Sequence, residues 1–309
     1  MKKKIKIKAC ATIANLSCGF DIIGLCVSDP YDIVEISIKE GKSNVTISEI
    51  QCIDDELSYD AKLNTAGKPI LDMLNHIDEL ISVDLKIFKG IPTGSGMGSS
   101  SASAVAAVYG FNKLIGNKFN NNQLLDFAAE GEKVSAGVRH YDNIGPCLLG
   151  GTILLVDRNP LKYVKLNSPT FYCILIHPEI KIKTKDSRSV IPDSISLLDA
   201  SKQWGYVGGL VHGLHTNSKE LMATSMKDII IEPNRSKLIP GFNEIKKTAI
   251  DLGAIGCSIS GSGPSVFAFS DDMDLAKKIA RNVKRIFKSH SIESKVFISE
   301  VNNSGPEVL

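Results

Sequence analysis

The sequence predicts an α+β protein built from two domains, and three observations lead to this fold class. The chain has 309 residues, and a length beyond roughly 200 residues usually indicates more than one domain. Short segments in which polar and apolar residues alternate, as in half-buried strands, are mixed with longer segments of helical periodicity. The two kinds of segment do not alternate strictly along the chain, so a doubly wound parallel sheet is not expected.

The first half of the chain contains alternating segments followed by helical ones. Strands are expected at residues 4–8, 34–39 and 83–88, where every second residue is apolar. Helices are expected at residues 64–80, 99–115 and 122–137, and the alanine-rich second helix should be buried. An apolar run at 153–156 predicts a further strand, and the Asp-Arg-Asn-Pro sequence after it predicts a turn. We place the domain boundary at this turn, which gives domains of residues 1–160 and 161–309.

The second half shows the same mixture. Strands are expected at residues 171–176, 265–269 and 295–301, and helices at residues 200–226, 240–252 and 273–289. The sequence has no internal repeat at a fixed period that would indicate a solenoid.

Charge and cysteine content restrict the function classes. Lysine and arginine total 36 and aspartate and glutamate 34, so there is no global attraction to nucleic acid, and no nucleic-acid partner is expected. The seven cysteines include no Cys-x-x-Cys pair, which argues against a disulfide framework or a cysteine zinc site and favours a cytoplasmic location. The N-terminus lacks the apolar region of a signal peptide, and no stretch of about 18 apolar residues indicates a membrane span.

The segment of residues 90–102 contains the most informative motif. Gly94, Gly96 and Gly98 follow a predicted strand and precede a predicted helix, so the backbone can approach a ligand and Ser99 or Ser100 can cap the helix. Free N–H groups and the helix dipole then favour a phosphate. The loop has neither the Gly-Lys-[Ser/Thr] ending of a Walker A motif nor the third glycine of a dinucleotide fingerprint. A flexible linker is the alternative, which the adjoining apolar strand and helix disfavour.

Two further segments gain meaning only together with this loop. Residues 11–25 contain Asn15 and Asp21, which alone would be read as turn residues, and residues 253–265 form a second glycine-serine cluster. The three segments, in this order, resemble the signature motifs of the GHMP small-molecule kinases. The middle motif of that superfamily is Pro-x-x-x-Gly-Leu-Gly-Ser-Ser-x-Ala, and this chain departs from it only by Met97 in place of leucine.

Within the superfamily, the details resemble the homoserine kinases. Residues 11–21 resemble their first motif, residues 140–146 resemble His-x-Asp-Asn-x-Ala-Pro, and residues 232–242 resemble Glu-Pro-x-Arg-x-x-Leu-Ile-Pro-Gly-Phe. The chain departs at Cys18, where glycine or proline is usual, and at Gly145, where alanine is usual. The matches extend from about residue 9 to residue 269, so they cover most of the chain.

The resemblance implies a fold and an activity. The first domain would have the ribosomal-protein-S5-domain-2-like fold and the second the ferredoxin-like GHMP fold, with the site in the cleft between them. The enzyme would transfer the γ-phosphate of ATP to the side-chain hydroxyl of L-homoserine, giving O-phospho-L-homoserine for threonine biosynthesis. The alternatives are a GHMP kinase for mevalonate, a sugar or an isoprenoid precursor, and a non-catalytic nucleotide-binding relative. A homodimer is also expected from the family, although no sequence feature specifies it.

The resemblance also assigns nucleotide and metal residues. The ATP-binding residues would be Asn64, Pro92, Gly94, Ser95, Gly96, Met97, Gly98, Ser99, Ser100 and Ser101. Ser100 and Glu132 would hold Mg²⁺, which prefers hard oxygen ligands. The plainer alternatives are that Asn64 caps a helix, and that Glu132 is an exposed carboxylate paired with Lys133 or Lys185.

Substrate and catalytic residues follow in the same way. Asn15, Asp21, His140 and Asp142 would meet the amine and hydroxyl end of homoserine, and Arg188 and Arg235 would bind its carboxylate. The catalytic residues would be Asn143, Glu132, Thr184 and Arg188, with Thr184 near the γ-phosphate. Several GHMP kinases have an aspartate where this chain has Asn143, and an asparagine cannot accept a proton at neutral pH. Catalysis would then depend on alignment and charge stabilisation. The alternatives are a loop histidine for His140 and surface charges for the two arginines.

Overall fold

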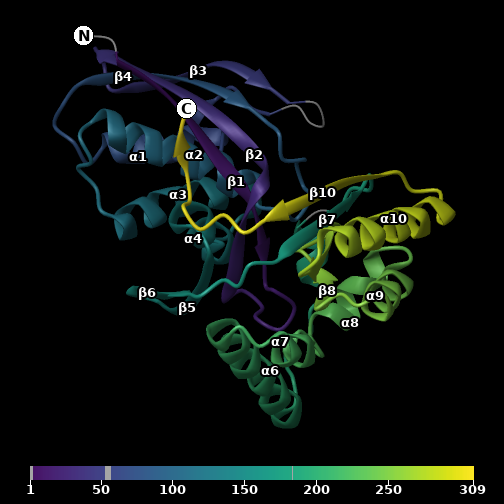
Figure 1. The fold of residues 1–309 in the computed structure, drawn as a ribbon. Helices are drawn as coiled ribbons and strands as arrows, with labels where there is room; N and C mark the ends of the chain where they lie inside the picture. The colour runs from purple at the N-terminus through teal and green to yellow at the C-terminus, as the bar shows by residue number, and fades with distance from the viewer. Residues whose placement is uncertain (1–2, 53–56, 183) are drawn as a thin grey trace.

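The computed structural model describes residues 3–52, 57–182 and 184–309, and it contains two separate β-sheets (Figure 1). The larger sheet has seven strands with the order β11-β1-β2-β4-β3, and β5 and β6 extend it from β2. Its strands are β1 (Lys3–Ala14), β2 (Ile23–Glu40), β3 (Asn44–Gln51), β4 (Ile81–Phe88), β5 (Thr152–Arg158), β6 (Leu161–Leu166) and β11 (Glu307–Val308). All pairings in it are antiparallel except β3 with β4.

The helices of the first half pack on this sheet. They are α1 (Gly67–Leu74), α2 (Ser99–Leu114), α3 (Asn121–Ala136) and α4 (Tyr141–Leu149), preceded by the short 3-10 turn η1 (Ala61–Leu63). Helix α2 contacts β1 and β2 on one side and α3 and α4 on the other. Its alanines and serines are buried because only small side chains fit between these neighbours. The expected burial of this helix is therefore confirmed.

The smaller sheet has four antiparallel strands in the order β10-β7-β9-β8. Its strands are β7 (Tyr172–Pro178), β8 (Gly256–Ile259), β9 (Val266–Ser270) and β10 (Ser294–Glu300). The helices of this half are α5 (Thr184–Ser189), α6 (Leu197–Thr216), α7 (Lys219–Ser225), α8 (Glu232–Arg235), α9 (Phe242–Asp251) and α10 (Met273–Ser289), with the 3-10 turn η2 (Ser236–Leu238). Helices α9 and α10 close a second core over this sheet, whereas α6 and α7 lie apart from them (Figure 1).

Two expected helices differ from the observed ones. The expected helix at 64–80 is confined to α1, because the ring of Pro69 is tolerated only in the first turn of a helix. The expected helix at 200–226 is two helices. Asn217 adopts a left-handed conformation at the end of α6, and the Ser218 hydroxyl caps α7 by accepting from Leu221 N at 3.3 Å. The other expected strands and helices are confirmed within a few residues at their ends, apart from the strand at 34–39, which is part of the much longer β2.

The chain does not leave the first sheet for good at residue 160. This residue lies in the turn between β5 and β6, which both belong to the larger sheet, and β11 pairs with β1 at Ile7 and Lys8. The division at residue 160 stays a prediction. The seven cysteines are all unpaired. Within the described ranges, the helices lack the combination of length and hydrophobicity that crossing a bilayer requires.

Candidate active site

The glycine-rich loop between β4 and α2 has the backbone that its sequence predicts. Gly94, Gly96 and Gly98 have φ values of 64°, 79° and 69°, which side chains rarely tolerate. Gly98 is the N-cap of α2, and it leaves the first turn without a side-chain cap. The expectation that a serine caps this helix is wrong, because Ser99 donates its hydroxyl to the Ile91 carbonyl at 3.0 Å. The first N–H groups of α2 therefore remain available for an anion.

The three glycine-rich or turn segments meet at this loop. Thr12 N donates to the Met97 carbonyl at 3.0 Å, and Ser265 N donates to the Ser95 carbonyl at 3.1 Å. The Ser260 hydroxyl donates to the Gly96 carbonyl at 2.8 Å. The segments that the sequence analysis grouped by resemblance are thus in direct contact.

The loop after β1 is held against the third segment. Asn15 donates from Nδ2 to the Gly261 carbonyl at 3.0 Å, and its Oδ1 accepts from Asp21 N at 2.9 Å. Asn15, Ser17 and Asp21 have positive φ, so this loop is strained by about 1 kcal/mol or more at each residue. Strain of this kind is often found at binding sites.

A chain of polar contacts joins Glu132 to Asp21 through a histidine. The Ser101 hydroxyl donates to Glu132 Oε1 at 2.7 Å, and His140 Nδ1 lies 3.1 Å from Glu132 Oε2. Arg188 Nη2 lies 3.1 Å from both His140 Nε2 and Asp21 Oδ2. A neutral ring that donates from Nδ1 and accepts at Nε2 satisfies both neighbours of His140.

Glu132 is therefore not an exposed helix carboxylate. It is 5% exposed and directed toward Ser101 and His140. Burial works against protonation of His140, but the hydrogen bond and the negative charge of Glu132 outweigh it and raise the pKa of His140. His140 is likewise part of this cluster rather than an isolated loop histidine.

Asp142 and Arg188 carry unsatisfied polar atoms. Among the described residues, four buried side-chain atoms have no hydrogen-bond partner, and three of them are Ser17 Oγ, Asp142 Oδ1 and Arg188 Nε. Burial, followed by the negative charge of Asp21, raises the pKa of Asp142 to about 6. A buried polar group without a partner costs about 1–3 kcal/mol, so these atoms fit a site whose ligand supplies the partners.

Arg235 is buried rather than a surface charge. It is 5% exposed and donates from Nε to the Ser187 carbonyl at 3.1 Å and from Nη1 to the Gly261 carbonyl at 2.9 Å. Its guanidinium lies over the ring of Phe20, 5.2 Å from the centroid, and burial lowers its pKa. Arg188, in contrast, has 36% of its side chain exposed.

The remaining expected residues are placed as follows. Asn143 Oδ1 accepts from the Thr12 hydroxyl at 2.7 Å. Asn64 accepts from Ala66 N at 2.9 Å and donates to the Ser58 carbonyl at 2.8 Å, which favours its role at the start of α1. Its contact with adenine stays a prediction. Thr184 begins α5, and its side chain lies outside the described part of the chain.

The sequence analysis missed a buried ion pair beneath the phosphate loop. Lys89 pairs with Asp32, and their side chains are 4% and 0% exposed. Asp32 Oδ1 also accepts from Gly90 N and Ile91 N at 3.0 Å each, and Lys89 donates to the Ser99 carbonyl at 2.8 Å. The pair thus joins both ends of the loop. The available signal was a charged residue inside an otherwise apolar strand.

Comparison with known proteins identifies the family. The model of the GHMP kinases N terminal domain matches residues 64–151, and the model of the GHMP kinases C terminal domain matches residues 207–289. A homoserine kinase of Chlorobium phaeobacteroides (strain BS1) is 40% identical over 313 residues, which cover 97% of this chain and 98% of that protein. The chain belongs to the GHMP kinases. The resemblance inferred from the motifs is confirmed.

Solved structures agree with this assignment. The crystal structure of homoserine kinase from Cytophaga hutchinsonii has 46% sequence identity and a TM-score of 0.96, and it covers 100% of this chain and 98% of that one. A mevalonate kinase of L. major, at 16% identity and a TM-score of 0.68, covers 97% of this chain and 96% of that one, and it shows the fold alone. This GHMP kinase has the expected α+β class, with the S5-like first domain and the ferredoxin-like second domain.

Proposed function

We propose that this GHMP kinase transfers the γ-phosphate of ATP to the side-chain hydroxyl of L-homoserine and forms O-phospho-L-homoserine, a step of threonine biosynthesis. The observation that carries the proposal is the set of unsatisfied atoms of Ser17, Asp142 and Arg188. A buried carboxylate and a guanidinium in one site are complementary to the ammonium and carboxylate of an amino acid. The similar proteins at 38–40% identity are named homoserine kinases, which supports the same substrate.

The phosphate loop would hold the nucleotide. Its positive-φ glycines expose backbone N–H groups, and the uncapped start of α2 presents further N–H groups to the phosphates. The buried pair of Lys89 and Asp32 keeps the ends of the loop in place before ATP binds. Such preorganisation matters because phosphoryl transfer depends mainly on positioning and charge stabilisation.

Ser100 and Glu132 would hold Mg²⁺ in this proposal. Their hydroxyl and carboxylate oxygens are hard donors of the kind that Mg²⁺ prefers. Within the described residues there is no cluster of three or more histidine, cysteine, aspartate or glutamate side chains suited to a metal. This fits Mg²⁺, which usually takes one or two protein carboxylates together with phosphates and water. When bound, the ion would neutralise charge on the phosphates.

The protein residues would align the reacting groups rather than remove the proton with a strong base. Asn143 is held by the Thr12 hydroxyl, so its amide can orient the homoserine hydroxyl toward the γ-phosphorus. The hydroxyl oxygen forms the new bond to phosphorus as the bond to ADP breaks, and the hydroxyl proton is lost to solvent or phosphate. Arg188 and Thr184 would stabilise the transferred group, and Arg235 would bind the substrate carboxylate.

The test is ADP release by purified protein with Mg-ATP, with and without L-homoserine. Homoserine-dependent release that stops with EDTA is expected. Stimulation by mevalonate or a sugar instead of homoserine would keep the kinase and reject the substrate. Nucleotide binding without ADP release for any alcohol would identify a non-catalytic relative.

Two further parts of the proposal concern the cellular setting. We place the enzyme in the cytoplasm, where its seven unpaired cysteines would stay reduced. We also expect a homodimer, because Leu197, Leu198 and Trp204 of α6 are 75%, 66% and 63% exposed. Sedimentation of the purified protein would measure its mass, and a monomer at micromolar concentration would reject the dimer.

A further inference from the structure

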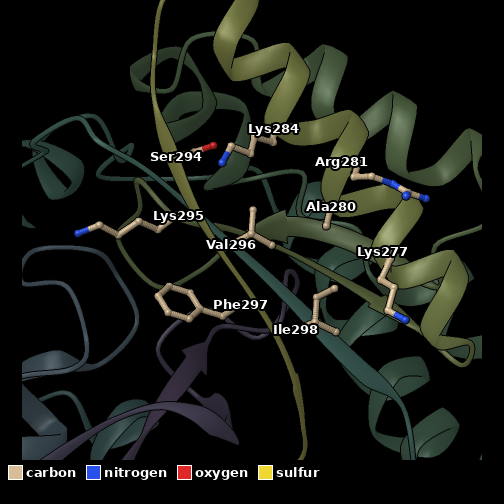
Figure 2. Close-up of a pocket in the computed structure, with 9 residues that line it drawn as sticks. All are labelled: Lys277, Ala280, Arg281, Lys284, Ser294, Lys295, Val296, Phe297 and Ile298. Carbon is tan, nitrogen blue, oxygen red and sulfur yellow. The ribbon is translucent and has the colours of Figure 1, made fainter.

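A groove on the second domain lies away from the active site and is strongly basic. It runs between α10 and the edge strand β10 and has a volume of about 690 Å³ (Figure 2). This volume is within the range of small-molecule sites, roughly 300–1,000 Å³. The lining residues do not include any residue of the phosphate loop or of the candidate substrate site.

One wall of the groove is a row of cations on a single helix face. Lys277, Arg281 and Lys284 follow one another at helical spacing, and Lys295 lies on the opposite strand. No acidic side chain lines the groove. In the described part of the chain, Lys277 pairs only weakly with exposed Asp274 at 3.4 Å, while Arg281 and Lys284 have no carboxylate within ion-pair distance.

The groove also contains the fourth unsatisfied buried atom of the described residues. Ser294 is 6% exposed, and its hydroxyl has no hydrogen-bond partner there. Figure 2 shows this hydroxyl directed toward the side of the groove where Lys284 lies. A buried hydroxyl is normally paired, so its position among cations points to a ligand that accepts hydrogen bonds.

The floor of the groove is apolar. Ala280 of α10 faces Val296 and Ile298 of β10, and Phe297 lines the same groove from the strand. A ligand that filled this space would therefore combine an anionic group with an apolar part.

We propose that this groove binds a small phosphate monoester with an apolar substituent. A phosphate has nearly two negative charges and three strong acceptor oxygens, which match Arg281, Lys284 and the Ser294 hydroxyl. A carboxylate has one charge and would leave part of the row of cations unpaired. The apolar substituent would lie on Val296 and Ile298.

The test uses phenyl phosphate as the probe, measured by isothermal titration on the whole protein. Arg281→Glu and Ser294→Ala should each weaken binding by about tenfold or more. Arg285→Glu is the matched control, since it makes the same charge change on the same helix outside the groove. It should change the affinity by less than about threefold.

Further arms separate the possible outcomes. Inorganic phosphate and benzoate should both bind more weakly than phenyl phosphate, because the first lacks the apolar part and the second has only one charge. Ser294→Ala should not lower the midpoint of thermal unfolding without ligand, because it removes a hydroxyl that has no partner. The proposal is overturned by no binding, by equal binding to all variants, by equal loss in Arg285→Glu, or by benzoate binding as tightly.

Discussion

The Thr12 hydroxyl donates a hydrogen bond to Asn143 Oδ1 at 2.7 Å, across 131 residues of sequence. This contact joins the end of β1 to α4 beside Gly98, the residue that begins α2. The Asn143 amide is thereby oriented at the phosphate loop without a charge of its own. Since the hydrogen bond uses an oxygen acceptor, an aspartate at this position could accept it equally well.

We therefore expect Asn143→Asp to retain substantial activity, within about tenfold of the wild-type kcat. Glu132→Ala should lose most of kcat, by about 10²-fold or more, because it removes the carboxylate that Ser101 and His140 contact and that would hold Mg²⁺. Steady-state ADP release measures both. An inactive Asn143→Asp enzyme together with a nearly normal Glu132→Ala enzyme would show that the two roles are assigned wrongly.

The raised pKa of Asp142, about 6, makes stability depend on pH in a defined direction. The folded state favours the protonated carboxyl, so this stabilisation is complete below the ordinary pKa of 3.8 and is lost as the pH rises to about 6. Asp142→Asn should therefore raise the free energy of unfolding at pH 7.5 by about 2 kcal/mol and have little effect at pH 3.5. The same variant should lose homoserine affinity. Urea unfolding at the two pH values checks the sign, and a less stable variant at pH 7.5 would contradict it.

Gly98 and Gly94 form a matched pair for testing the phosphate loop. Both have positive φ, so alanine costs about 1 kcal/mol of backbone strain at either position. A Cβ at Gly98 would lie 2.1 Å from Thr12 Oγ1, whereas a Cβ at Gly94 would meet nothing within 4 Å. Gly98→Ala should therefore lower kcat/KM for ATP at least about tenfold more than Gly94→Ala. Equal effects would mean that strain alone explains both.

The buried pair of Lys89 and Asp32 should position the loop as well as stabilise the fold. Lys89→Met leaves the Asp32 carboxylate buried without its cation and should cost about 3–5 kcal/mol of unfolding free energy. The double variant with Asp32→Asn should regain part of this loss. In both variants the KM for ATP should rise while the KM for homoserine changes little, because the pair contacts only the nucleotide loop.

Lys247→Met is the control for this experiment. Lys247 pairs with Asp251 on the surface, with side chains 78% and 60% exposed, so the change should stay within about 0.5 kcal/mol. An unchanged KM for ATP in the Lys89 variants would show that the pair is structural only.

Local patterns in the sequence determined the elements and the family. The strand and helix periodicity of β4 and α2, the glycines between them and the sequence of α10 depend on neighbouring residues, so they could be predicted without a structure. The motif resemblance likewise identified the GHMP kinases. Local patterns were misleading where one residue interrupts a long periodic segment, as Asn217 does between α6 and α7.

Tertiary structure alone decided the environment of each site residue. Glu132 could be an exposed carboxylate until α2 and α3 pack and bring Ser101 to it. Arg235 could be a surface charge until Gly261 and Ser187 surround it. The physical reason is that periodicity records which face of an element is apolar, whereas burial, hydrogen-bond partners and pKa depend on which distant segments the topology brings to that face.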